Sequence, residues 1–157
     1  MEIDYIDLWK GFYHSAVRYI TIGGFAVNFY GFDRSTGDID FLIENTLDNR
    51  KKIRKAFIEL GIGNFEQIET MEFLAGWSDF SLGFGMKLDL MTSIMGLGEK
   101  SFEELYQSSE VVQIRDIPVR FIDYQNLIAT KKATGRPKDL HDIEELEKIK
   151  KWRGKKD

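Results

Sequence analysis

Residues 38–43 read Asp-Ile-Asp-Phe-Leu-Ile, a short apolar segment with two carboxylates that follows a polar turn. This pattern predicts a strand, in which residues i and i+2 point to the same face. Asp38 and Asp40 then project together, whereas the residue that follows each of them enters the core. Aspartate is disfavoured in strands, and two like charges roughly 7 Å apart repel each other unless a cation lies between them. The segment therefore indicates a site for a divalent metal ion, with a solvent-facing strand end as the alternative.

The segment at 87–91 repeats this logic, because Leu88 and Leu90 share one face and Asp89 takes the other. On a strand beside the first, Asp89 completes a set of three carboxylates, the hard oxygen ligands that magnesium combines with water and phosphate oxygens. Two such ions about 4 Å apart activate an attacking hydroxyl and stabilise a leaving pyrophosphate. An acid on the solvent face of a strand is the alternative, and Asp79 is then the next candidate for the third ligand.

Gly23-Gly24 lies between the apolar run at 19–22, which predicts a buried strand, and a helical stretch at 25–30. Bare backbone N–H groups and the positive end of a helix can receive phosphate oxygens at this point. An ordinary glycine turn is the alternative. Thirteen residues separate Gly24 from Asp38, enough for one helix and a return strand, so the phosphate cradle and the metal site can meet at one edge of the sheet.

Three polar side chains near these motifs are candidates for phosphate binding. Arg34 and Thr36 precede the two acids, although an ion pair within the turn explains Arg34 equally well. Lys131 lies on a predicted helix that begins at Asp123, on the same face as Leu127, and so points toward the body of the protein. A lysine there needs an anion, which a triphosphate would supply. A side chain that extends along the edge of the core to solvent is the alternative.

Charged residues follow Gly135-Arg136-Pro137, the junction between the last two predicted helices. Lys138 and Asp142 are spaced i,i+4, and the simplest expectation is that they form an ion pair with each other. The other explanation is that the charged side chains of this segment brace Lys131 or contact a second substrate.

The alternation and periodicity of the rest predict a mixed α/β (α+β) fold in one domain, residues 1–157. Its strands form one central sheet, helices pack on that sheet, and two helices close the chain. Two to four strands are expected within 65–93, with tight turns near Gly76 and at 83–85. The other predicted elements are helices at 3–17, 25–30, 47–60, 102–107, 123–134 and 138–152, and strands at 19–22, 38–43, 111–115 and 119–122.

The amino-acid composition limits which metal ligands the site can contain. The chain has no cysteine and only two distant histidines, which excludes thiolate metal sites and disfavours zinc, so any metal must be bound mainly by oxygen. No apolar run is long enough to span a membrane, and the acidic start does not resemble a secretory signal, so we expect a cytoplasmic protein.

The net charge of −4 argues against a general affinity for nucleic acid, but the last ten residues are strongly basic. A solvated helix end, with cations near its C-terminus, is the favoured explanation for this basic run, and an RNA contact is the alternative. Its members are Lys148, Lys150, Lys151, Arg153, Lys155 and Lys156.

The motifs G-G-F-A at 23–26, R-S-T-G-D-I-D-F-L-I at 34–43 and L-D-L at 88–90 together resemble the nucleotidyltransferase superfamily built on the DNA polymerase beta palm. The stretch at 122–146 resembles its short stand-alone bacterial members, which include toxins of abortive-infection type and nucleotidyltransferases that act on lincosamide antibiotics. The resemblance extends over residues 19–43, 86–93 and 122–146, which is 58 of the 157 residues, and the order of elements agrees over the rest.

The resemblance implies that Asp38 and Asp40 bind the metal ions, that Asp89 is the third ligand or the base, and that the glycine pair holds the triphosphate. It also implies that a lysine of the helix from 123, here Lys131, reaches the triphosphate. Many members have Gly-Ser where this chain has Gly-Gly, so a serine hydroxyl contact to phosphate is absent at Gly24.

The leading functional hypothesis is transfer of a nucleoside monophosphate from an NTP to a hydroxyl, dependent on Mg²⁺ or Mn²⁺, with release of pyrophosphate. The acceptor is a small molecule, a tRNA end or a protein side chain. Because the chain leaves little room for an acceptor-binding domain, a second subunit or an antitoxin is a candidate partner. The alternatives are a non-catalytic member that binds nucleotide or a partner protein, and a carboxylate-pair hydrolase, which leaves the glycine pair and Lys131 unexplained.

Overall fold

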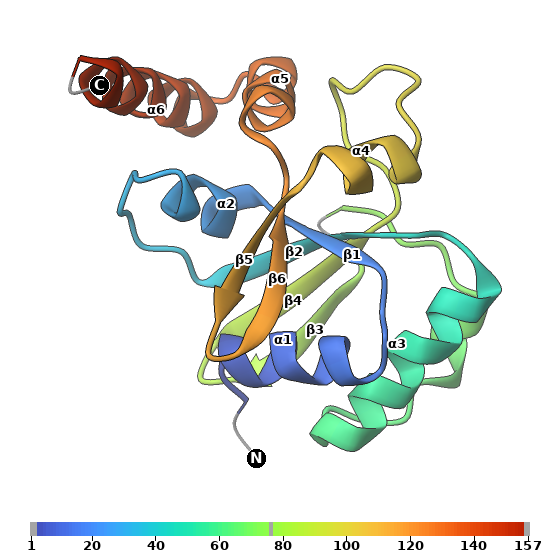
Figure 1. Cartoon of the computed structure of the whole chain (residues 1–157). Helices are drawn as coiled ribbons and strands as arrows, with labels where there is room; N and C mark the ends of the chain where they lie inside the picture. Colours follow the sequence, from blue (N-terminus) through green and yellow to red (C-terminus); the bar gives the residue numbers. More distant parts are fainter. Residues whose placement is uncertain (1–2, 76, 156–157) are drawn as a thin grey trace.

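The computed structural model describes residues 3–75 and 77–155, which build one six-stranded sheet with helices on both faces (Figure 1). In chain order the elements are α1 (Tyr5–His14), β1 (Tyr19–Ile22), α2 (Gly23–Phe29), β2 (Asp38–Ile43), α3 (Leu47–Leu60), the 3-10 helix η1 (Glu66–Glu69), β3 (Asp79–Gly83), β4 (Met86–Met91), α4 (Phe102–Ser108), β5 (Glu110–Ile114), β6 (Ile117–Phe121), α5 (Tyr124–Thr134) and α6 (Pro137–Gly154). The strand order is β3-β4-β2-β1-β6-β5. Strands β2 and β4 are parallel, as are β1 and β6, and the other neighbours are antiparallel. The mixed sheet with two C-terminal helices is therefore as predicted.

The predicted bounds hold best where the sequence pattern is regular. Strands β1 and β2 and helix α3 begin and end where the pattern places them. The segment at 65–93 holds two strands and η1, the lower end of the expected range, and the predicted turn at Gly76 lies outside the described residues. Helix α2 begins at Gly23 rather than at Phe25, so the glycine pair forms the first turn of the helix instead of a loop ahead of it.

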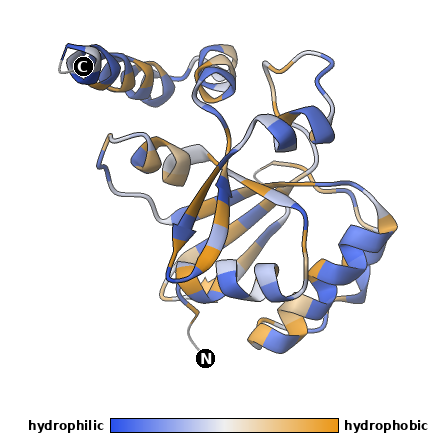
Figure 2. Ribbon diagram, in the orientation of Figure 1, coloured by the Kyte–Doolittle hydropathy of each residue, from blue (hydrophilic) through white to orange (hydrophobic). Residues whose placement is uncertain are grey.

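The main core lies between the sheet and the helices α1 and α3. Phe41 of β2 packs against Phe12 of α1, with ring centroids 5.3 Å apart, and Phe12 in turn lies against Phe57 of α3. The alternate residues of β2, Asp40 among them, face the opposite side, where α2, α5 and α6 lie (Figure 1). Figure 2 shows hydrophobic residues concentrated on the strands, whereas α6 is mostly hydrophilic. The acids therefore project away from the main core.

Local chemistry determines where the helices begin and end. Asp4 and Asp7 cap the start of α1 reciprocally, and the Asp123 carboxylate accepts a hydrogen bond from the N–H of Asn126 at the start of α5. Helix α5 ends at Gly135, whose φ of 58° is the left-handed conformation that favours glycine. Within the described ranges, none of the helices has the length and apolar character that crossing a membrane requires.

A buried asparagine holds α3 against the ends of the two central strands. Asn49 is 1% exposed, and its Oδ1 accepts a hydrogen bond from the N–H of Arg18 at 2.8 Å. Its Nδ2 donates to the carbonyls of Arg18 and Glu44, at 3.0 and 2.9 Å. These backbone groups lie just outside β1 and β2, and Asn49 gives the Arg18 N–H a partner and each of the two carbonyls a second donor.

We predict that Asn49→Asp destabilises the fold by about 2 to 4 kcal/mol, because a carboxylate loses both donors and faces two carbonyl oxygens in a buried position. Urea denaturation measures the change. The control is Asn64→Asp, in which an exposed side chain keeps its role as acceptor for Arg54, and it should change stability by less than about 0.5 kcal/mol. Equal stability of the two variants would contradict the role assigned to Asn49.

Candidate active site

A cavity of about 660 Å³ lies where β1 ends, β2 begins, and α5 meets α6. All of the residues that the sequence singled out for phosphate or metal binding line it. These are Gly23, Gly24, Arg34, Thr36, Asp38, Asp40, Asp89 and Lys131. Residues that are more than 100 positions apart in the chain are thus brought to one site by the fold.

The strand register brings the three acids together. Asp40 of β2 is the in-register neighbour of Asp89 on the parallel strand β4, and neighbouring strands lie about 4.8 Å apart. Asp38 lies two residues before Asp40 and so shares its face. Asp79 of β3 is in register with Asp89 but does not line the cavity, and it forms an ion pair with Lys87 at 3.3 Å.

The Asp40 carboxyl has a strongly raised pKa. Burial raises its pKa to about 7, and the neighbouring charges of Asp89 and Asp38 act in the same direction. Lys131 and Lys138 lower this pKa without cancelling the rise. A divalent cation among the three acids would reverse the balance, because it favours the ionised form.

The donor set fits magnesium better than a metal that demands a complete protein cage. Within the described residues, no three His, Cys, Asp or Glu side chains already have the spacing of a metal site. Magnesium keeps several waters and takes further oxygens from substrate phosphates, so it needs only one or two carboxylates from the protein. The facing pair Asp40 and Asp89, with Asp38 beside them, meets that requirement.

Gly23 lies directly against the acids. Its φ of 66° is left-handed, and a Cβ atom at this position would collide with Oδ2 of Asp40. Only glycine therefore allows the backbone to pass this close to the carboxylate. The predicted meeting of glycine pair and acids is confirmed, but it occurs at the ends of the two central strands and not at a lateral edge of the sheet.

The second glycine makes room for a hydroxyl from another segment. A Cβ atom on Gly24 would lie 2.6 Å from Oγ1 of Thr36, so a larger residue requires Thr36 to move. The Thr36 hydroxyl also donates a hydrogen bond to the carbonyl of Asp38 at 3.1 Å. A hydroxyl thus lies beside the first turn of α2 even though the chain has no serine there.

A buried ionic network forms the wall of the cavity beside α5 and α6. Lys131 is 7% exposed, and its Nζ lies 2.9 Å from Asp142 and 3.4 Å from Asp139. Arg34 makes two hydrogen bonds to the Asp142 carboxylate, at 2.8 and 2.9 Å. Arg136 pairs with Asp139 at 2.7 Å. Three cations meet two carboxylates, which leaves one positive charge in excess next to the cavity.

The predicted ion pair between Lys138 and Asp142 is wrong. Asp142 is fully buried and faces Arg34 and Lys131, whereas Lys138 is exposed and makes no ion pair with any residue the structure describes. The turn ion pair considered for Arg34 is likewise replaced by one with α6. Burial alone would raise the pKa of Asp142, but the hydrogen bonds from Arg34 and Lys131 outweigh it and hold the pKa below its ordinary value.

Several residues of the cavity were not assigned from the sequence. Arg136, Lys138 and Asp139 belong to the charged segment at the helix junction, for which bracing of Lys131 was one of the explanations, and Asp139 does pair with Lys131. Ile94 and Met95, in the loop after β4, also line the cavity and contribute apolar side chains to it. No sequence signal marks those two, because a loop has no periodicity to show which side chains face inward.

Comparison with known proteins shows the fold. No family model and no curated protein matches the sequence. A Thermotoga maritima protein described as a candidate nucleotidyltransferase superposes with a TM-score of 0.55 at 15% identity, covering 96% of this chain and 90% of its own. The antibiotic-resistance factor ANT(2'')-Ia superposes with 0.58 at 17%, covering 96% and 89%, and the lincosamide antibiotic adenylyltransferase LnuA with 0.58 at 14%, covering 95% and 99%. At these identities the likeness establishes the nucleotidyltransferase fold that the sequence motifs resemble.

We predict that Lys131→Ala destabilises the protein by about 3 kcal/mol or more, because it leaves two buried carboxylates with less compensation. The control is Lys138→Ala, which removes an exposed lysine from the same cavity and should change stability by less than about 0.5 kcal/mol. Urea denaturation of both variants measures the two changes in unfolding free energy. A Lys131→Ala protein as stable as the wild type would show that the network does not contribute to folding.

We predict that, in EDTA, Asp40→Asn gains stability relative to the wild type as the pH rises. A carboxyl whose native pKa is about 7 favours the folded state fully below its unfolded pKa near 4, and this contribution is lost as the pH rises through 7. The difference in unfolding free energy between the two proteins should shift by about 2 to 3 kcal/mol in favour of the variant from pH 5 to pH 8. Denaturation curves at several pH values measure it, and a constant difference would contradict the raised pKa.

Proposed function

We propose that this chain, which has the fold of nucleotidyltransferases, transfers a nucleoside monophosphate from an NTP to a hydroxyl and releases pyrophosphate. The observation that carries the proposal is the facing pair Asp40 and Asp89, with Asp38 beside them, in a cavity whose neighbouring wall is cationic. Carboxylates for metal ions and cations for phosphates are the two requirements of nucleotidyl transfer.

Asp38 and Asp40 would hold the Mg²⁺ or Mn²⁺ ion that carries the triphosphate, and Asp89 would serve the acceptor side as a second ligand or as the base. The ion supplies charge neutralisation and lowers the pKa of an oxygen bound to it. The raised pKa of Asp40 supports its role as a metal ligand, because a bound cation would stabilise the ionised form that burial disfavours.

The triphosphate would lie between the first turn of α2 and the start of α6. The backbone at Gly23 and Gly24 provides close approach, and the hydroxyl of Thr36 lies beside it. Arg34 and Lys131 face the cavity, but both are held by Asp142, so we assign them the positioning of this wall and a shared contact to phosphate. Lys138 lines the cavity, is exposed and has no ion pair among the described residues, which supports a direct contact to the phosphates.

A small molecule is the acceptor class best supported. ANT(2'')-Ia has been crystallised with adenylyl-2''-tobramycin, and LnuA with bound lincomycin. In this chain Met91 lies two residues after Asp89 on the same strand, and with Ile94 and Met95 it forms an apolar wall of the cavity. An uncharged or weakly charged hydroxyl compound suits that wall better than a polyanion. An antitoxin or a second subunit remains a hypothesis that no contact in the structure supports.

The test separates the three acids by role. Calorimetric titration of Mg·NTP should show at least roughly tenfold weaker binding for Asp38→Asn and Asp40→Asn, because ligands of the ion that carries the triphosphate are removed. Asp89→Asn should keep most of the binding but lose transfer, since it raises only the barrier to hydroxyl attack. Transfer is followed with each labelled NTP, magnesium and either lincomycin, tobramycin or total RNA as acceptor.

The matched control is Asp79→Asn. Asp79 lies in register with Asp89 on the same sheet but outside the cavity, so its variant should bind and transfer like the wild type. Loss of transfer in Asp79→Asn together with normal transfer in Asp89→Asn would move the third role to Asp79. Binding of Mg·NTP without transfer to any acceptor, in the wild type as well, would favour a non-catalytic nucleotide-binding protein.

A further inference from the structure

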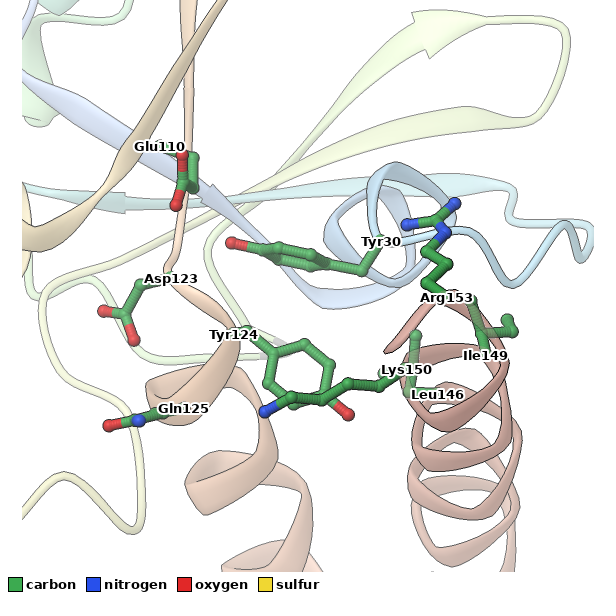
Figure 3. A pocket seen from close by; sticks show the side chains of 9 residues that line it. All are labelled: Tyr30, Glu110, Asp123, Tyr124, Gln125, Leu146, Ile149, Lys150 and Arg153. Atoms are coloured by element: carbon green, nitrogen blue, oxygen red, sulfur yellow. The ribbon is translucent and has the colours of Figure 1, made fainter. Parts of the chain in front are cut away.

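A second cavity, of about 420 Å³, lies at the opposite end of the α5–α6 pair (Figure 3). Its lining includes Tyr30 at the end of α2, Tyr124 at the start of α5, and Leu146, Ile149, Lys150 and Arg153 of α6. Lys150 in this cavity follows Lys138 of the first cavity by twelve residues on one helix, which corresponds to about 18 Å. The two cavities are therefore separate sites on the same pair of helices.

One side of the second cavity is cationic. Lys150 and Arg153 are spaced i,i+3 on α6, so they share a face of the helix, and both line the cavity. Neither forms an ion pair with a residue that the structure describes. A Cβ atom on Gly31 would lie 2.8 Å from Nη2 of Arg153, so the glycine leaves the room that the guanidinium occupies. Two cations without an ion pair among the described residues thus line one open cavity, with the Arg153 guanidinium beside Tyr30 and the Lys150 ammonium beside Tyr124 (Figure 3).

The middle of the second cavity is aromatic. The rings of Tyr30 and Tyr124 meet edge to face, with centroids 5.5 Å apart. The Tyr30 hydroxyl donates a hydrogen bond to the carbonyl of Ile122 at 2.7 Å, which fixes that ring. The Lys150 ammonium lies 4.6 Å from the centroid of the Tyr124 ring, a cation–π contact that places the charge beside the aromatic surface, as Figure 3 shows.

The remaining side offers hydrogen-bond acceptors. Asp123 lines the cavity, but its carboxylate already accepts hydrogen bonds from Asn126 and Ser108. Glu110 and Gln125 are exposed, and Glu110 forms no ion pair within the described ranges. In Figure 3 the Glu110 carboxylate and the Gln125 amide lie on the side away from Arg153. The cavity therefore combines two cations from α6, two tyrosine rings and hydrogen-bond acceptors on the side away from Arg153.

We propose that this second cavity binds a nucleoside monophosphate unit. Such a ligand has an anionic phosphate for Arg153 or Lys150, a flat base that packs on the tyrosines, and amine or hydroxyl donors for Glu110. The unit is either a free nucleotide or the end of an RNA strand, since both present the same groups. The proposal does not depend on the nucleotidyl transfer proposed for the first cavity, and it gives the basic run of α6 a specific ligand.

The experiment measures binding of AMP, GMP, CMP and UMP by calorimetry in EDTA, where metal-dependent binding in the first cavity is suppressed. The wild type should bind at least one of them. The double variant Lys150→Ala/Arg153→Ala should bind it roughly tenfold or more weakly, because charge-assisted hydrogen bonds to phosphate are lost. It should still bind Mg·NTP as the wild type does, so failure here is distinguishable from failure of the proposed function.

Two controls isolate the cavity. Lys151→Ala/Lys155→Ala removes two cations of the same basic run that do not line the cavity, and it should leave binding unchanged. Lys138→Ala, in the first cavity, should also leave metal-free binding unchanged. No binding by the wild type, equal losses in both double variants, or a loss confined to Lys138→Ala would each overturn the proposal. So would binding of free tyrosine, an aromatic zwitterion, in place of the nucleotides.

A parallel titration with the tetranucleotide AAAA identifies the source of the ligand. Tighter binding of the tetranucleotide than of AMP, lost in Lys150→Ala/Arg153→Ala, would support the proposal with an RNA end as the ligand. Equal or weaker binding of the tetranucleotide than of AMP would support it with a free nucleotide.

Discussion

Asp40 and Asp89 lie opposite each other on parallel strands, on the face that the buried apolar residues around them leave to polar side chains. Ile39 and Leu88 are fully buried on the far face of β2 and β4, and a shift of one residue would turn them to solvent and the acids into the core. The hydrophobic core therefore forces two like charges to within one strand spacing. Burial and the neighbouring charges of Asp89 and Asp38 raise the pKa of Asp40, and a bound metal ion would lower it again.

The fully buried Asp142 holds two cations, Arg34 and Lys131, at the wall of the first cavity. This carboxylate on α6 receives Arg34 from the loop before β2 and Lys131 from α5, so one side chain joins three segments that are distant in the sequence. A buried carboxylate requires such partners, and the partners are thereby kept at the wall of the cavity. Folding stability and the placement of the cations that line the first cavity thus depend on the same contacts.

Helices α5 and α6 connect this wall to the second cavity. The start of α6 and the end of α5 line the first cavity, and the opposite ends of the two helices line the second. The cations of the second cavity form no ion pair with a described residue, whereas Arg34 and Lys131 of the first are paired with the buried Asp142. This difference distinguishes the chemistry of the two cavities. The second combines its two cations with two tyrosine rings.

The sequence alone determined the strands that carry the acids, the position of the glycine pair and the inward face of Lys131, because each follows from a local period of two or of three to four residues. It could not show that Asp142 pairs with Arg34 and Lys131 rather than with Lys138. Spacing along a helix ranks only the partners on that helix, whereas a buried carboxylate takes whichever cations the packing brings to it. The apolar wall at Ile94 and Met95 was decided by tertiary structure for a related reason. Which side chains of a loop face a cavity depends on the elements packed around that loop, and no local pattern encodes this.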